Sequence, residues 1–212
     1  MNIGQTLVQI VILLPVFLLA LSVHEFSHGY VSYLLGDPTA KMEGRLTLNP
    51  MAHLDPIGTL VLVLTRMFGW AKPVPINPSY YENPRKGMMY VGLAGPGSNF
   101  IMAILFSGMW MILIQTGLIS PFTSMQSVMG IVAMMISMGI QINIALGVFN
   151  LIPIPPLDGS KILRGLLPRK FDQYFHQLEG PQGMIIIFIL LATGVLGRII
   201  RPVINLFMGL LL

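Results

Sequence analysis

The sequence His24-Glu25-Phe26-Ser27-His28 lies within a long apolar stretch, about residues 6–35. Because an α-helix turns once every 3.6 residues, histidines four positions apart share one face and can bind one metal ion. Glu25 lies about 100° round the helix, where its carboxylate can reach a nearby water without binding the metal. Roughly one shuffled chain in a thousand would carry this pattern. The structural alternative is that the histidines are polar contacts between membrane helices.

The composition indicates a membrane protein of one domain. The 212 residues are 54% hydrophobic and 9% charged, with a mean hydropathy of +0.77, far from the composition of soluble domains. The chain has no cysteine, so disulfides and thiolate metal ligands are excluded. The net charge is +4, but the sequence has no run of basic residues with interleaved aromatic residues. No nucleic-acid partner is therefore expected. The first apolar stretch lacks the basic start and cleavage site of a signal peptide.

Four apolar stretches are long enough to cross or nearly cross a bilayer, at about residues 6–35, 88–119, 128–151 and 181–212. The sequence thus predicts an all-α polytopic membrane protein. Gly197, Arg198, Arg201 and Pro202 interrupt the fourth stretch, whose last part is expected to be an interfacial helix or half of a bent one. A shorter stretch, about residues 57–68, predicts a re-entrant or interfacial segment.

Basic residues predict the orientation. They fall in two loops, one between the first and second spans (Lys41, Arg45, Arg66, Lys72, Arg85 and Lys86) and one between the third and fourth (Lys161, Arg164, Arg169 and Lys170). The loop at residues 120–127 has no charged residue. The positive-inside rule then places both basic loops in the cytoplasm. We therefore expect the active site to open toward the cytoplasmic side, with water reaching it through a polar cleft.

Two histidines leave a catalytic zinc site one protein ligand short. Asp158 is the acidic residue that follows the end of a membrane helix on the cytoplasmic side, in Asn150-Leu-Ile-Pro-Ile-Pro-Pro-Leu-Asp158-Gly159. The three prolines break the helix and can hold a carboxylate rigidly at membrane depth. Asp158 can equally be the N-cap of the helix that begins near Ser160. Spacing alone leaves both readings open.

Three motifs together resemble the site-2 protease family of intramembrane zinc metalloproteases: HEFSH within one span, Gly95-Pro-Gly-Ser-Asn99 at the start of another, and the Asn150-to-Gly159 motif at the end of a third. The resemblance covers a three-helix core, about residues 5–160, and leaves about 161–212 as a C-terminal helical extension. No room remains for an appended PDZ or CBS domain, so we expect a compact member of the family. We also expect it to lie in a prokaryotic cell membrane.

The resemblance implies that His24, His28 and Asp158 bind one Zn²⁺ per chain and that Glu25 is the general base. It also implies that Asn99 and Asn150 hold the substrate backbone or the reacting carbonyl. The alternatives from the residues themselves are helix packing for Asn99, beside the small residues Gly95, Gly97 and Ser98, and capping of freed carbonyls for Asn150.

Two further segments lie between the first and second spans. His53 and Asp55, in a Pro- and Gly-containing turn, either form a second polar pair near the active-site mouth or bond the backbone of their turn. The second reading is favoured. Residues 70–77 are too proline-rich for a helix and suit an edge strand, to which an unwound substrate could add, or an ordinary interfacial loop.

Together with the HEFSH pattern, the resemblance implies a zinc metalloendopeptidase that cleaves membrane-protein substrates with a transmembrane helix in the lipid bilayer. Two alternatives remain, a metal transporter and a non-proteolytic escort protein. The sequence leaves the oligomeric state and the physiological substrate open.

Overall fold

The computed structural model describes residues 3–65, 70–120, 123–124 and 127–211. Its helices are α1 (Ile3–Leu34), α2 (Thr39–Met42), α3 (Pro56–Thr65), α4 (Pro84–Gln115), α5 (Val128–Asn150), α6 (Asp158–Leu166), α7 (Asp172–Leu178), α8 (Pro181–Ala192) and α9 (Val195–Leu211). Short 3-10 helices lie at η1 (Pro50–Ala52), η2 (Pro78–Tyr80) and η3 (Arg169–Phe171). The predicted all-α class is confirmed.

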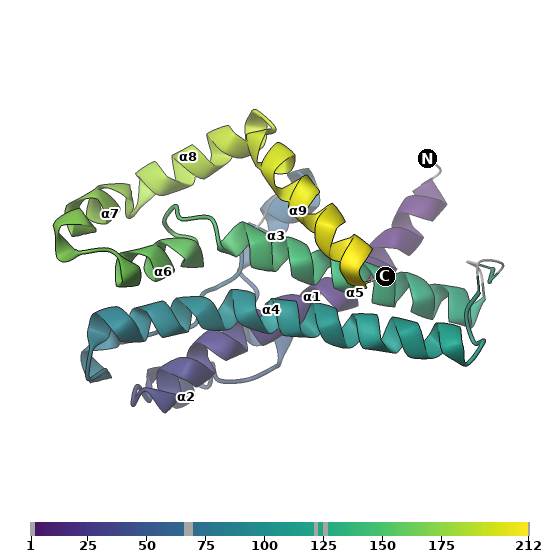
Figure 1. The fold of residues 1–212 in the computed structure, drawn as a ribbon, viewed down its shortest axis with the longest axis horizontal. Coiled ribbons are helices and arrows are strands. Elements are labelled where there is room, and N and C mark those ends of the chain that lie inside the picture. Colours follow the sequence, from purple (N-terminus) through teal and green to yellow (C-terminus); the bar gives the residue numbers. More distant parts are fainter. Residues whose placement is uncertain (1–2, 66–69, 121–122, 125–126, 212) are drawn as a thin grey trace.

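Three long helices form the core, as Figure 1 shows for α1, α4 and α5. Each contains a stretch long and apolar enough to cross a membrane: Ile12–Leu34, Pro84–Gln115 and Val128–Asn150. The helices are apolar on nearly every side, because one side packs on the other helices and another faces lipid. Ala103, Ile136, Ile140 and Ile144 are buried between α4 and α5. Ile101, Ile104 and Ile112, also on α4, are exposed.

Local signals set the starts of α4 and α5. The Asn83 side chain accepts a hydrogen bond from the Lys86 N–H and Pro84 is the first helical residue, while Ser127 accepts from the Gly130 N–H. These are ordinary N-cap arrangements. Because α4 begins at Pro84 rather than near residue 88, residues 95–99 lie near the middle of the helix, not at its start as predicted.

The fourth apolar stretch is not one helix. α8 ends before Gly194, whose φ of 71° lies in the left-handed region that glycine adopts readily. α9 then runs without a break through Pro202, so the interruption lies at Gly194 rather than at residues 197–202. Counting Arg169–Leu178 and Pro181–Ala192, which meet at 72°, as one bent span gives up to four candidate spans. α9 packs Phe207 against Phe100 of α4, with 5.5 Å between ring centroids.

The segment between the first and second spans contains the short helix α3. Within the described ranges there is no β-strand, and residues 70–77 form no edge strand; the one bridge is an isolated antiparallel pair, Leu54 with Ala71. A strand needs a row of backbone partners, and the prolines at 73 and 75 have no N–H to offer. Residues 66–68 of the predicted apolar segment, Arg66 among them, lie outside the described residues.

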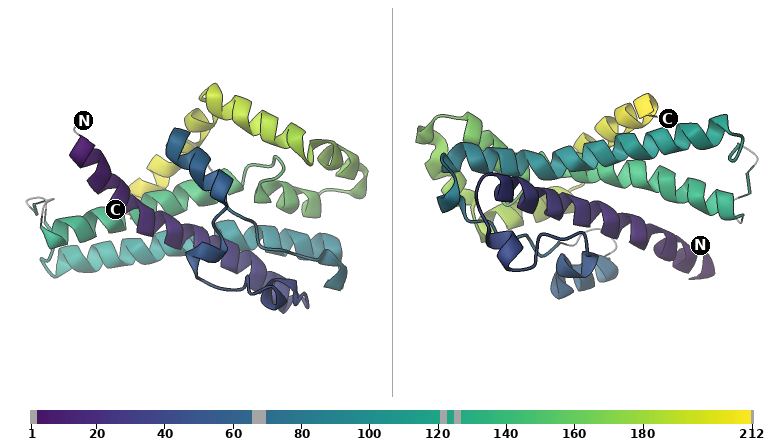
Figure 2. Two further views of the ribbon diagram at one scale, coloured as in Figure 1. Left: turned by 180° about the vertical axis from the view of Figure 1, so that it is seen from behind. Right: turned by 90° about the horizontal axis from the view of Figure 1, so that it is seen from below.

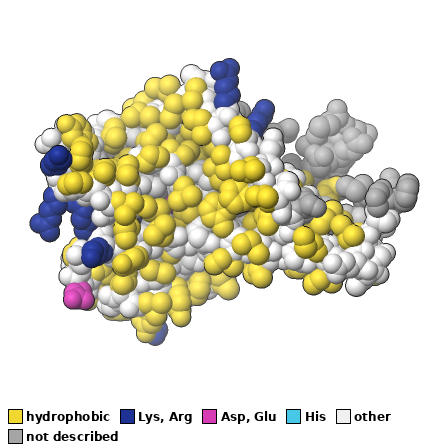
Figure 3. Space-filling model, viewed as in Figure 1, with side chains coloured by type: hydrophobic (Ala, Val, Ile, Leu, Met, Phe, Trp, Pro, Cys, Tyr) yellow, Lys and Arg dark blue, Asp and Glu magenta, His cyan; other side chains and the backbone are white. Residues whose placement is uncertain are grey.

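Parts of both basic loops lie at one end of the bundle. Figures 1 and 2 show α2, the start of α4, α6 and α7 together at that end, opposite the N-terminus and the turn between α4 and α5. Figure 3 shows hydrophobic side chains over most of the visible face. Lys and Arg side chains gather at the α6–α7 end, with others near the turn between α8 and α9. The helices therefore form an integral membrane protein with one strongly basic end.

Candidate metal centre

His24 and His28 project from the same face of α1 into the centre of the bundle. Their rings meet edge to face, with centroids 4.6 Å apart, and their Nε2 atoms are 3.0 Å apart. Both side chains are buried. The helical spacing in the HEFSH sequence therefore brings the two imidazoles together as predicted.

Asp158 completes the group from the other side of the bundle. α5 ends at Asn150, and the chain turns back so tightly that a Cβ on Gly159 would lie 2.1 Å from the Leu151 carbonyl oxygen. This turn brings Asp158 Oδ2 to 3.2 Å from His24 Nε2 and 3.1 Å from His28 Nε2. Leu157 is the N-cap of α6 and Asp158 is its first residue, with its Oδ1 bonded to Lys161 Nζ. This geometry is consistent with Asp158 as a metal ligand.

Hydrogen bonds on the far side of each ring decide what the Nε2 atoms can do. His28 Nδ1 lies 2.7 Å from the Val91 carbonyl oxygen, which can only accept, so Nδ1 carries the proton. A neutral imidazole has one N–H, so His28 Nε2 presents a lone pair. His24 Nδ1 likewise donates to Asn99 Oδ1 at 2.6 Å. Two nitrogen lone pairs and a carboxylate oxygen therefore converge in a buried site.

A cation bound among the members of such a buried group would stabilise it. Three ligands held tetrahedrally by zinc at about 2.0–2.1 Å are separated by about 3.3 Å, close to the 3.0, 3.1 and 3.2 Å found here. His24, His28 and Asp158 are the group of possible metal ligands among the described residues. The donor set and its spacing fit a zinc ion with a fourth position left open.

A chain of amides fixes the orientation of the His24 ring. Asn99 Nδ2 donates to Asn143 Oδ1 at 2.9 Å and to the Ala20 carbonyl at 3.3 Å. Asn143 Nδ2 in turn donates to the Gly139 carbonyl at 2.8 Å. Both amides are fully buried. Partners of this kind hold a metal-binding histidine in one tautomer, so the structure places Asn99 behind His24.

The outer oxygen of Asp158 is held by Lys161, one turn further along α6. Lys161 Nζ lies 2.8 Å from Asp158 Oδ1, which leaves Oδ2 directed at the histidines.

The chain approaches the site closely at Gly95 of α4, where a Cβ would lie 2.4 Å from His28 Nε2 and 2.6 Å from His24 Cε1. A side chain at this position would therefore collide with both histidines. By contrast, a Cβ on Gly97 would meet nothing within 4 Å.

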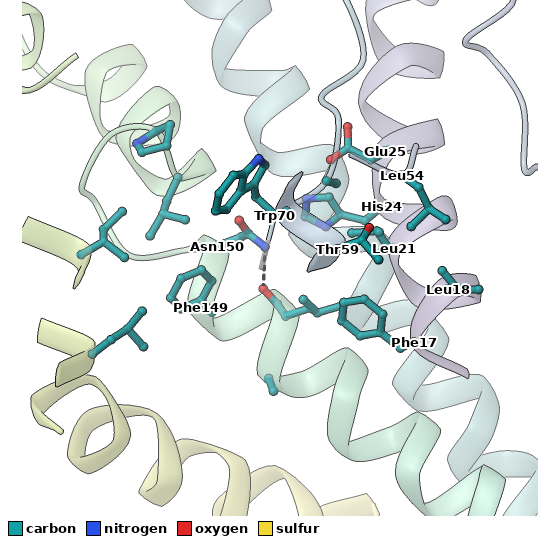
Figure 4. Close-up of a pocket in the computed structure, with 18 of the residues that line it drawn as sticks. Phe17, Leu18, Leu21, His24, Glu25, Leu54, Thr59, Trp70, Phe149 and Asn150 are labelled. Carbon is teal, nitrogen blue, oxygen red and sulfur yellow. Dashed lines mark hydrogen bonds between the residues drawn. The ribbon is translucent and has the colours of Figure 1, made fainter. Parts of the chain in front are cut away.

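Glu25 lies beside the histidines at the wall of an apolar cavity of about 410 Å³. Figure 4 shows His24, Glu25, Trp70 and Asn150 around this space. Its other walls are mainly aliphatic and aromatic side chains from α1, α5, α8 and α9 (Leu14, Phe17, Leu21, Ala145, Phe149, Ile187 and Ile200 among them). Asn150 lines the cavity while its Nδ2 donates to the Leu146 carbonyl at 3.0 Å. The site thus joins polar groups to a pocket suited to an apolar side chain.

Residues 71–77, which we call the 71–77 segment, cross this site and are held at several points. Arg45 donates to the carbonyls of Lys72 and Pro73 at 2.9 and 3.2 Å. The Lys72 N–H donates to the His53 carbonyl at 2.9 Å, and the Asn77 N–H donates to Asp37 Oδ2 at 2.7 Å. Between these anchors, the Val74 N–H donates to Glu25 Oε2 at 3.0 Å. The segment is therefore fixed to α1 and to the turns that follow it.

Asp37 anchors the end of the 71–77 segment beyond the last turn of α1. Burial favours its neutral form and so raises its pKa, but hydrogen bonds from Thr39, Asn77 and Ser32 outweigh burial. The net effect is a pKa below the ordinary value of 3.8. Asp37 therefore remains a carboxylate while it holds these donors.

His53 and Asp55 do not line the cavity. His53 is buried, with Nε2 2.7 Å from the Thr47 carbonyl, and Asp55 Oδ1 accepts from the Gly58 N–H at 2.7 Å at the start of α3. Both side chains thus bond the backbone of their turn, the favoured reading of the sequence. Leu54 between them does line the cavity.

Sequence reasoning did not assign Asn143, Lys161 or Val74 to the site. The sequence did give a reason to consider Asn143, since a polar residue in an apolar span is costly unless it is bonded. It gave a weaker reason to consider Lys161, which lies three residues after Asp158 on a helix. It gave no reason to consider Val74, because Val74 contributes only a backbone N–H.

Comparison with known proteins agrees with this geometry. Residues 12–192 match the model of Peptidase family M50. The chain is similar to "Putative zinc metalloprotease YwhC" of Bacillus subtilis, with 37% identity over 192 residues, 89% of this chain and 83% of the relative. It is also similar to "Putative zinc metalloprotease Rip2" of Mycolicibacterium smegmatis (27% over 186 residues; 86% and 67%) and to "Zinc metalloprotease MJ0392" of Methanocaldococcus jannaschii (28% over 148 residues; 70% and 32%). No solved structure gives a significant match.

Proposed function

This chain belongs to Peptidase family M50, and on that premise we propose that it is a zinc-dependent intramembrane endopeptidase. Its substrates are membrane proteins, cleaved within or near a transmembrane segment. The observation that carries the proposal is the buried group of His24, His28 and Asp158, in which two lone pairs and a carboxylate converge beside an apolar cavity. A metal ion bound among these atoms would accept all three donors, which supports the proposal.

The residues of the site have different roles in hydrolysis. His24, His28 and Asp158 would hold zinc, which when bound would supply a Lewis acid to polarise a carbonyl and make water more acidic. Glu25 accepts a proton from the attacking water as the oxygen bonds to the carbonyl carbon. When the C–N bond breaks, Glu25 returns that proton to the leaving amine.

The two asparagines support different parts of this site. Both ends of the Asn99 amide are bonded to protein groups, so Asn99 serves to orient His24. Asn150 faces the cavity, which supports a role in holding the backbone of a bound substrate. This division departs from the expectation that both asparagines contact substrate.

The cavity beside Glu25 favours an apolar substrate segment. Its walls are almost entirely hydrocarbon, and its volume of about 410 Å³ accepts a large side chain. A transmembrane helix hides its peptide groups in i to i−4 hydrogen bonds, so the substrate must unwind locally before attack. Helix-breaking residues near the scissile bond should therefore favour cleavage.

The basic end of the bundle is proposed to face the cytoplasm. A second cavity of about 630 Å³ opens there, lined by Arg85, Lys161, Arg164, Asp172 and Glu179 among others. Lys161 connects it to Asp158, which supports water access from this side.

Ile57 and Leu60 are exposed on α3, which supports an interfacial or re-entrant position for that helix. α9 packs on the core, which supports one domain over residues 1–212.

Purified wild type and Glu25→Gln should be compared on a panel of single-pass transmembrane peptides in detergent. Wild type is expected to cleave, whereas Glu25→Gln should keep about one zinc per chain and lose cleavage, because its amide cannot accept the proton. His24→Ala should lose both, and Glu82→Gln, a change at an exposed site, should lose neither. An active Glu25→Gln protein would contradict the role of Glu25.

A further inference from the structure

Glu25 is held by a backbone group far away in the sequence. The Val74 N–H donates to Glu25 Oε2 at 3.0 Å across a separation of 49 residues, in a buried environment. Among the described residues no hydrogen-bond partner is found for Glu25 Oε1. One oxygen of the carboxylate is thus fixed, and the other remains for proton transfer.

The local sequence makes Val74 the one possible donor at this point of the segment. Val74 stands between Pro73 and Pro75, which have no N–H. Arg45 fixes the chain just before Val74 through the carbonyls of Lys72 and Pro73, and Asp37 fixes it just after through the Asn77 N–H. The N–H is therefore presented to Glu25 by a chain anchored on both sides.

We propose that the Val74 N–H positions the Glu25 carboxylate for proton transfer, which makes Val74 a positioning residue of the reaction. The inference rests on the proposed function, because it assumes that Glu25 is the base. A carboxylate on a long side chain loses rotamer freedom when it is held, and misplacement of a reacting group by about 1 Å can lower the rate about 100-fold. Hydrogen bonds to a charged acceptor are among the strongest available for this purpose.

The side chain of Val74 has a separate, structural role. A Cβ on Gly29 of α1 would lie 3.0 Å from Val74 Cγ1, so the isopropyl group packs closely on the helix. The N–H contribution is independent of that packing. Two substitutions separate the roles: Val74→Ala removes packing and keeps the N–H, whereas Val74→Pro also replaces the N–H hydrogen by the ring carbon Cδ. Because Val74 precedes Pro75, its backbone is already confined to the extended region, which suits proline.

The first experiment compares cleavage of one transmembrane peptide by wild type, Val74→Ala, Val74→Pro and Glu25→Gln, with zinc content measured for each. We expect Val74→Pro to retain zinc, to lower kcat at least about tenfold below Val74→Ala, and to leave KM within about threefold. Equal kcat for Val74→Pro and Val74→Ala, with wild type active, would overturn the inference alone. An inactive wild type would instead overturn the proposed function, and the inference would fall with it.

A second measurement does not depend on the folding of Val74→Pro. Amide hydrogen exchange of the 71–77 segment is compared between Glu25→Ala, which removes the acceptor, and Glu25→Gln, which keeps an acceptor oxygen. The Val74 N–H should exchange at least about tenfold faster in Glu25→Ala than in Glu25→Gln. The Lys72 N–H, bonded to the His53 carbonyl, serves as the internal reference. Equal exchange at Val74 in the two variants would contradict the contact on which the inference depends.

Discussion

Replacement of Gly95 by alanine should weaken metal binding, although alanine adds neither a polar nor a charged group. A Cβ at this position would lie 2.4 Å from His28 Nε2, 2.5 Å from His28 Cε1 and 2.6 Å from His24 Cε1. Carbon atoms in contact lie about 3.5–4.0 Å apart, so the rings or α4 must move by about 1 Å. Metal–ligand distances tolerate about 0.2 Å. We expect zinc affinity to fall at least about 100-fold, equivalent to about 2.8 kcal/mol.

The matched control is Gly97→Ala on the same helix. A Cβ there meets nothing within 4 Å, and both substitutions change helix propensity by the same amount, about 1 kcal/mol in favour of alanine. Zinc affinity is measured by competition with a chelator on purified protein in detergent, with helicity recorded by circular dichroism. Gly97→Ala should bind zinc as wild type does. A Gly95→Ala protein that binds zinc within about threefold of Gly97→Ala would refute the close approach of α4 to the histidines.

Three further predictions follow from other contacts of the site. Asn143→Leu removes the group that holds Asn99 behind His24, so zinc affinity measured by the same competition should fall about 10–100-fold; unchanged affinity would argue against the amide chain. Asp37 has a lowered pKa, so its contribution to stability is present above the ordinary value and is lost as the pH falls through the folded-state value. Asp37→Asn should therefore unfold more readily than wild type at neutral pH, with the difference in unfolding midpoint shrinking as the pH falls below 3.8; a difference independent of pH would contradict this. Ala145→Phe narrows the apolar cavity, so kcat/KM should fall about 10-fold or more for peptides with a large residue beside the scissile bond and little for those with alanine; equal losses on both would contradict the cavity as the substrate pocket.

Local periodicity made much of the metal site predictable. His24 and His28 share a helix face whatever surrounds them, and the prolines between Asn150 and Asp158 end a helix by removing N–H groups. The long apolar stretches likewise predicted the three core helices. Each of these inferences depends on neighbours along the chain.

What the sequence did not predict depends on contacts between distant segments. Gly95 and Gly97 look alike in the sequence, but two residues turn a helix by about 200°, so only Gly95 faces the histidines. Asn143 was visible as a polar residue in an apolar span, yet its pairing with Asn99 depends on how α4 and α5 are rotated against each other. Residues 70–77 suited either an edge strand or an ordinary interfacial loop, and tertiary anchors at Arg45 and Asp37 hold part of this stretch as a single segment without strand pairing.

The most direct test of the central claim is mass spectrometry of a transmembrane peptide incubated with zinc-loaded wild type in ¹⁸O-labelled water. Hydrolysis adds the water oxygen to the acyl carbon and a proton to the leaving amine. The account predicts two fragments from a cut within or near the apolar segment, with one ¹⁸O in the new carboxylate, and no fragments after zinc is removed. Peptides left intact by the zinc-loaded wild type, or cut equally well without zinc, would contradict it.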